Sequence, residues 1–93
     1  MTGAELIVAE RQRQIEQENW SAGHDDAHQH GELRDAASCY LLDAGVHPTG
    51  DPGGWWPWDD AWWKPSDDPV RNLVKAGALL AAEIDRISRM RRQ

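Results

Sequence analysis

Tryptophan is concentrated in one short stretch of this chain. The sequence contains six tryptophans and no phenylalanine, and five of the six lie within residues 55–63, which read WWPWDDAWW. In an extended or irregular backbone, neighbouring side chains point in roughly opposite directions, so the adjacent pairs Trp55/Trp56 and Trp62/Trp63 must each serve two surfaces. A chain of 93 residues has a single core. The second surface is therefore expected to be another subunit, a ligand that stacks on indole, or both.

Length and cysteine content predict one small domain. A core of this size supplies little net stability, and oligomerisation is a ready source of further burial. The lone cysteine, Cys39, allows no intrachain disulfide, which favours a reducing compartment. It lies in the apolar stretch 36–42, which predicts a buried, unreactive thiol. There is no basic leader and no apolar run near the roughly 18 residues of a membrane span, so we expect a cytoplasmic protein of a bacterial host, without a membrane partner.

The net charge of −6 is unevenly distributed. Residues 1–63 hold three basic against twelve acidic side chains, whereas residues 64–93 hold seven basic against four acidic ones. Duplex nucleic acid is excluded as a partner because backbone binding needs a broad basic face. A small anionic ligand remains compatible, because it needs only a few basic groups or free helix amides.

Hydrophobic periodicity predicts an all-α domain of three helices, at about residues 4–18, 32–44 and 69–91. The first is rich in strong helix formers but has a thin apolar stripe. The second has an apolar stripe at helical spacing. That stripe comprises Leu33, Ala36, Ala37, Tyr40, Leu41 and Ala44. A polar His/Asp loop at 19–31 and a long, ordered Trp-rich loop at 45–67 connect the three helices, and the Pro and Gly content of the second loop argues against regular structure there.

The third helix has the clearest start, because Asp68 is a good N-cap and Pro69 suits the first helical position. Small residues at 76–78 predict the close approach of another helix or of a Trp ring. The helix carries an apolar face through about five turns. That face comprises Val70, Leu73, Val74, Gly77, Leu80, Ala81, Ile84 and Ile87. We expect the first and third helices to assemble the chain into a homo-oligomer.

Residues 24–32 contain several side chains that can bind a metal. The candidate ligands are His24, Asp25, Asp26, His28 and Glu32. Their spacing matches no standard zinc motif, and a solvated loop with Asp turn bonds is the favoured interpretation. The alternative is a divalent ion such as magnesium or manganese bound through Asp25, Asp26 and Glu32.

The Trp-rich loop and the basic residues that follow it form the second candidate site. Its residues are Trp55, Trp56, Trp58, Trp62, Trp63, Lys64, Arg71 and Lys75. Trp20, Trp58 and one member of each adjacent pair are expected to fill the core in place of phenylalanine. The remaining rings could stack on a nucleobase or bury against a second subunit. Arg71 would suit a phosphate near the helix N-terminus, although an exposed pair with a neighbouring aspartate is also compatible.

Two segments carry a resemblance to known proteins. Residues 6–14 followed by Trp20 and His24, together with residues 70–86, resemble small phage and prophage proteins that are distantly similar to the MazG-like all-α nucleotide pyrophosphohydrolases. The resemblance covers about half of the chain and implies an all-α fold with a nucleotide-sized pocket. A weaker resemblance joins residues 20–28 and 57–60 to ryanodine-receptor-type repeat domains.

The MazG-like magnesium motifs, Glu-Glu-x-x-Glu and Glu-x-x-Asp, are degenerate in this sequence. The second helix offers only Glu32 and Asp35, and the third places Asn72 and Lys75 where carboxylates would be expected. Lys75 would repel the catalytic cation. The resemblance therefore implies that the pocket is retained and that hydrolysis is in doubt.

The sequence therefore favours a non-catalytic phage-type protein that needs no cofactor and binds a small nucleotide-like ligand, sequestering a host defence signal. One alternative is a magnesium-dependent pyrophosphohydrolase that uses Glu32, Asp35, Asp25 and Asp26. The other is a protein–protein interaction module built on the Trp-rich loop.

Overall fold

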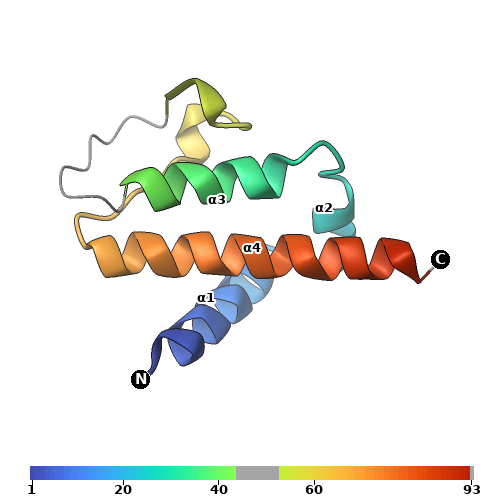
Figure 1. Ribbon diagram of the computed structural model, residues 1–93, viewed down its shortest axis with the longest axis horizontal. Helices are drawn as coiled ribbons and strands as arrows, with labels where there is room; N and C mark the ends of the chain where they lie inside the picture. Colours follow the sequence, from blue (N-terminus) through green and yellow to red (C-terminus); the bar gives the residue numbers. More distant parts are fainter. Residues whose placement is uncertain (44–52, 93) are drawn as a thin grey trace.

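The computed structural model describes residues 1–43 and 53–92. Its elements are α1 (Gly3–Gln17), α2 (Ala22–Asp26), α3 (Glu32–Asp43), the 3-10 helices η1 (Gly53–Trp55) and η2 (Asp60–Trp62), and α4 (Pro69–Arg91). The described residues contain helices and no strand, which confirms the all-α prediction (Figure 1). The predicted end of the second helix at residue 44 and the first part of the Trp-rich loop, 45–52, lie outside these residues.

The helix ends follow from local capping chemistry. Thr2 and Glu5 form a capping box at the start of α1, each side chain bonding the backbone N–H of the other. The Asp68 side chain accepts a hydrogen bond of 2.9 Å from the Val70 N–H, and Pro69 is the first residue of α4, as the sequence predicted. Such caps satisfy backbone groups that a helix leaves unpaired, so they favour the observed starts of α1 and α4.

A short helix, α2, lies in the connector that the sequence predicted to be a loop. Asn19, with φ of 58°, turns the chain out of α1, and the Ser21 side chain then accepts from the His24 N–H at 3.3 Å. The predicted count of three helices is thus one short for the described residues. Five residues are too few to show a helical period, and periodicity therefore could not reveal α2.

The long helix α4 organises the fold. It packs against α1, α2 and α3, with α3 alongside it and α1 crossing it at an angle (Figure 1). The buried core cluster lies between α3 and α4. It comprises Leu33, Ala36, Ala37, Tyr40, Ala76, Leu79 and Ala82. The stripe predicted for the second helix is confirmed at its four members in this cluster, whereas Leu41 is 54% exposed.

The apolar face predicted for the third helix is only partly buried. Val74 is buried, but Val70, Leu73, Leu80 and Ile84 are all more than two-fifths exposed. The reason is that α3 packs on the side of α4 that carries mainly small residues, which leaves much of the larger aliphatic face uncovered. No described helix has the length and apolar character needed to cross a membrane.

Gly77 allows α1 to approach α4 closely. A β-carbon built at this position would lie 2.6 Å from Cδ1 and 2.9 Å from Cγ1 of Ile7. These distances are shorter than a van der Waals contact, so the missing side chain makes room for Ile7. The predicted close approach at residues 76–78 is confirmed, and its partner is a helix.

Candidate functional site

The Trp pairs each divide between two surfaces. Trp55 is 74% exposed and Trp62 is 51% exposed, whereas Trp56 and Trp63 are half-buried against the core cluster. This arrangement packs one ring of each pair against the core. It also leaves two large indole faces in contact with solvent.

An inner group of aromatic rings holds the Trp-rich loop against α3. Tyr40 packs against Trp56 and Trp63 with ring centroids 5.8 and 4.6 Å apart, and Trp56 packs against Trp58 at 5.4 Å. The Tyr40 hydroxyl also accepts a hydrogen bond of 3.2 Å from the Lys64 N–H. Trp56 and Trp63 were predicted to bind ligand, but they belong to this scaffold and line neither of the two cavities described next.

A second anchor joins the end of the Trp-rich loop to α4. The Asn72 side chain accepts from the Ser66 N–H and donates to the Ser66 carbonyl, both at 2.8 Å. Asn72 is fully buried. This residue, placed by the family resemblance where a carboxylate would be expected, is therefore a structural anchor for the loop.

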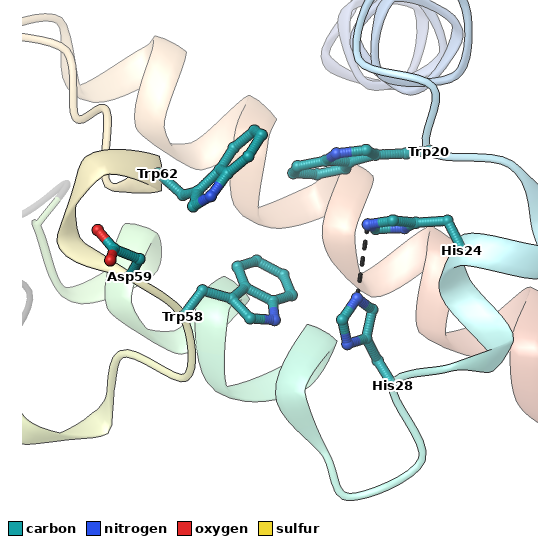
Figure 2. A pocket seen from close by; sticks show the side chains of 6 residues that line it. All are labelled: Trp20, His24, His28, Trp58, Asp59 and Trp62. Atoms are coloured by element: carbon teal, nitrogen blue, oxygen red, sulfur yellow. Dashed lines mark hydrogen bonds between the residues drawn. The ribbon is translucent and has the colours of Figure 1, made fainter.

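The first cavity is lined by aromatic rings and has a volume of about 310 Å³ (Figure 2). We call it the aromatic cavity; its lining residues are Trp20, His24, His28, Trp58, Asp59 and Trp62. Trp20 stacks on His24 with ring centroids 5.4 Å apart and planes within 5°, and His28 packs against Trp58 at 5.2 Å. Figure 2 shows Trp20 and Trp62 on one side of the space and Trp58 below it.

The second cavity, of about 290 Å³, is rich in charged groups. We call it the cationic cavity, because four of its lining side chains are basic and two are acidic. The charged residues are Arg13, Lys64, Arg71, Lys75, Glu10 and Glu18. It therefore unites the three basic residues predicted from the sequence with Arg13, which was not predicted.

Glu10 organises the guanidinium groups of the cationic cavity. Its carboxylate is buried and accepts from Arg13 at 2.9 Å and from Arg71 at 2.5 Å. Burial raises the pKa of Glu10, but the hydrogen bonds and charges of Arg13 and Arg71 outweigh burial and hold this pKa below its ordinary value. Glu10 is thus an anion that fixes two cations in place.

The two lysines of the cationic cavity, Lys64 and Lys75, make different contacts. The Lys75 ammonium donates to the Lys64 carbonyl at 2.5 Å and lies 5.4 Å above the Tyr40 ring. Burial and the neighbouring Arg71 lower the pKa of Lys75 below its ordinary value. The Lys64 ammonium lies 5.8 Å from the Trp62 ring. Within residues 1–43 and 53–92, neither lysine forms a salt bridge with a carboxylate, and both charges can be offered to an anion.

The two cavities share Trp20 and Trp62 in their walls. The arrangement thus places stacking surfaces beside positive charge. Trp58, Trp62, Lys64, Arg71 and Lys75 are the predicted ligand residues that the structure brings together here. Trp55 lies elsewhere, in a cavity lined also by Leu42 and Cys39.

The carboxylates of the predicted metal site point in different directions. Asp25 is fully buried and pairs with Arg11 of α1, while Asp26 pairs with Arg89 of α4 at 2.7 Å. Glu32 instead accepts from the His30 N–H at 2.6 Å. Over the part of the chain that the structure describes, no group of three or more His, Cys, Asp and Glu side chains is placed to hold a metal ion.

The sequence did not predict several of the residues that line the two cavities. Trp20, which belongs to both cavities, was assigned to the core, and Arg13, Glu10 and Tyr40 were not singled out as candidates. In sequence, Glu10, Arg13 and Gln14 are typical of an exposed helix face. Only the fold shows that Glu10 and Gln14 are buried and that Glu10 contacts Arg71, sixty-one residues away. The one available signal in the sequence was the thin apolar stripe of the first helix, which leaves the polar residues Glu10 and Gln14 to be buried with it.

Comparison with protein-family models, curated protein sequences and solved structures finds no significant match to this chain. The resemblance to MazG-like proteins stays a prediction.

Proposed function

We propose that this protein binds a small nucleotide-like anion, with the base in the aromatic cavity and the phosphate in the cationic cavity. The supporting observation is that the two cavities share Trp20 and Trp62. Every nucleobase has a π-face that can stack on indole, and phosphate is recognised by lysine and arginine. The exposed Trp62 ring, with the Lys64 ammonium beside it, is the position at which both kinds of contact are available to one ligand.

We propose that the role is binding rather than hydrolysis. Of the carboxylates that a MazG-like mechanism would require, Asp25 and Asp26 pair with arginines on other helices. Lys75 lies in the cavity where the phosphate would bind. A cation there suits a bound phosphate and opposes a bound magnesium ion. Sequestration of a host defence signal, which the resemblance to phage proteins implies, is the biological role in which such binding would suffice.

Calorimetry with a panel of mono-, di- and cyclic nucleotides tests the proposal. Trp62→Ala is expected to weaken binding by about 5- to 150-fold, the equivalent of one stacked base. Trp55→Ala is the matched control, because Trp55 is also exposed but lines a different cavity. Absence of heat with every nucleotide, or equal loss in both variants, would exclude the proposal.

The phosphate half of the site has its own test. Lys64→Ala is expected to weaken a nucleotide more than its nucleoside and to reduce the salt dependence of binding, because Lys64 would contact only the phosphate. Arg91→Ala, at the exposed end of α4, is the control of equal charge change. The alternative, a magnesium-dependent nucleotide pyrophosphohydrolase, would be supported if the protein released pyrophosphate from a nucleotide, if this required magnesium, and if it stopped in Glu32→Ala.

A protein-interaction role is the second candidate, because Trp55 and Leu42 are 74% and 76% exposed in the walls of one cavity. Large exposed aromatic and aliphatic side chains of this kind are typical of contact surfaces. Two variants distinguish nucleotide binding from protein interaction. Trp55→Ala would abolish capture of a protein partner and spare nucleotide binding, and Trp62→Ala would do the reverse.

We also retain the homo-oligomer as a proposal. It is supported by the uncovered aliphatic face of α4, at Val70, Leu73, Leu80 and Ile84. Sedimentation of the wild-type chain beside Leu80→Glu tests it, since a charge at the centre of that face would dissociate an oligomer formed through it. A wild-type chain that sediments as a monomer would contradict it.

A further inference from the structure

The imidazole rings of His24 and His28 meet edge to face at the rim of the aromatic cavity, with their planes 71° apart. Their Nε2 atoms are 3.5 Å apart, and Figure 2 marks this contact. The rings are four residues apart in sequence, His24 in α2 and His28 just beyond its end. Both are partly accessible from the cavity that they line.

Each ring is oriented from behind by a carboxylate. The Nδ1 atom of His24 lies 3.1 Å from Asp25 Oδ1, and Nδ1 of His28 lies 3.3 Å from Glu32 Oε2. Because a carboxylate only accepts hydrogen bonds, each Nδ1 carries the proton and donates it. In the neutral ring, Nε2 then presents a lone pair.

The two carboxylates are themselves held in place. Asp25 is fully buried and pairs with Arg11, and Glu32 accepts from the His30 N–H. Metal-binding histidines show the same arrangement, in which Nδ1 donates to a fixed carboxylate and Nε2 presents its lone pair to the ion. Here it occurs twice, on two rings whose Nε2 atoms approach each other.

The spacing between the two Nε2 atoms suits a shared metal ion. Two neutral rings in these tautomers bring two lone pairs together, which is unfavourable unless a proton on one ring or a metal cation lies between them. With metal–nitrogen bonds of about 2.0–2.1 Å and a tetrahedral angle, two ligand nitrogens lie about 3.3–3.4 Å apart. The observed 3.5 Å differs little from that separation.

We propose that His24 and His28 bind one late first-row transition-metal ion, such as zinc, through their Nε2 atoms. Imidazole favours such ions over magnesium, which prefers oxygen ligands. Asp25 and Glu32 orient the ligands rather than coordinate the ion. The chain supplies two donors, so the remaining positions are open to water or to a donor atom of a molecule in the aromatic cavity. The site borders the cavity proposed for the base, but metal binding needs no nucleotide and can be tested with the metal alone.

Titration of the chelator-treated protein with zinc chloride tests this site, with magnesium chloride in parallel. We expect one zinc ion per chain and no heat with magnesium. His24→Ala and His28→Ala are each expected to abolish zinc binding. Glu32→Gln, which keeps the side-chain shape but removes the charge, is expected to weaken it by about 10- to 100-fold.

His30→Ala is the matched control, because His30 is exposed and contacts Glu32 only through its backbone N–H. It is expected to bind zinc like the wild type. Circular dichroism checks the folding of each variant, and His28→Gln replaces any alanine variant that does not fold. Copper(II) gives a second measurement, because an ion between rings that pack on Trp20 and Trp58 would quench indole fluorescence in the wild type and not in His28→Gln.

The proposal is overturned if the wild-type chain binds no zinc, if magnesium binds as well as zinc, or if zinc binding survives loss of both His24 and His28. Equal loss of zinc binding in His30→Ala would also overturn it, since the ion would then belong to a different set of histidines.

Discussion

Ile7 of α1 lies against Gly77 of α4, in the space that a side chain at position 77 would occupy. The effect of a larger residue at 77 therefore depends on Ile7. We expect Gly77→Leu to destabilise the protein by about 1–3 kcal/mol, because it overpacks the helix crossing.

With Ile7→Ala already present, Gly77→Ala should instead stabilise the protein by about 0.5–1 kcal/mol, since alanine is the better helix former and the clash is gone. Urea denaturation of the four combinations of wild type, Ile7→Ala, Gly77→Ala and the double variant measures the coupling. Strictly additive effects would show that the two residues are not in contact.

Asp25 and Asp26 are neighbours in sequence but differ in burial. Asp25 is fully buried beside Arg11, whose side chain is 13% exposed, so Asp25→Asn should cost about 3–5 kcal/mol by leaving a buried guanidinium unpaired. Asp26 is 48% exposed, and breaking its pair with Arg89 should cost about 0.2–1 kcal/mol. The free energy of unfolding in urea compares the two variants, and equal losses would contradict the burial of Asp25.

Glu10 should make the protein sensitive to acid. Its folded-state pKa lies below the ordinary value of 4.5, so its contribution to stability is present above that value and is lost as the pH falls through the folded-state pKa. We expect the free energy of unfolding to fall less steeply with acid in Glu10→Gln than in the wild type. At neutral pH the same variant should be less stable by about 1–3 kcal/mol, because a charged hydrogen-bond acceptor is lost.

Glu16→Gln is the control for this experiment, because Glu16 is exposed on the same helix and bonds only Gln12 among the interactions described for it. It should reproduce the wild-type pH dependence. Identical acid profiles for Glu10→Gln and the wild type would contradict the network around Glu10.

Tyr40 is the only tyrosine in the chain, so its ionisation can be followed by absorbance without interference from another tyrosine. Burial raises the pKa of Tyr40 above its ordinary value of 10.0, although the hydrogen bond from the Lys64 N–H opposes this. The neutral form is favoured in the folded state, so the resulting stability is present below pH 10.0 and is lost as the pH rises through the folded-state pKa. If Tyr40 instead ionised with its ordinary pKa of 10.0, its phenol would be exposed.

Tyr40→Phe tests the anchoring of the Trp-rich loop. It keeps the ring that packs against Trp56 and Trp63 but removes the acceptor for the Lys64 N–H, and we expect a loss of about 0.5–1.5 kcal/mol. Acrylamide should quench the tryptophan fluorescence of this variant more strongly than that of the wild type, since the Trp-rich loop is held less firmly against α3. Unchanged stability and quenching would show that ring packing alone fixes the loop.

The sequence alone determined the helical class of the fold and the start of α4, because periodicity and capping act between residues a few positions apart. It also determined that each Trp pair divides between core and surface, because alternation of neighbouring side chains is a local property of the backbone. Tertiary structure decided which ring of each pair turns inward, since that depends on Tyr40 and α3, far from the loop in sequence.

Tertiary structure also decided the membership of the candidate site. Trp20, Glu10 and Arg71 belong to three separate segments and meet in the cationic cavity, and Gly77 contributes by letting α1 approach α4 closely. Likewise, the spacing of residues 24–32 could not distinguish carboxylates that would bind a cation from carboxylates that pair with arginine, because Arg11 and Arg89 are supplied by other helices. A local pattern lists which groups are available, and the packing of distant helices determines which of them face each other.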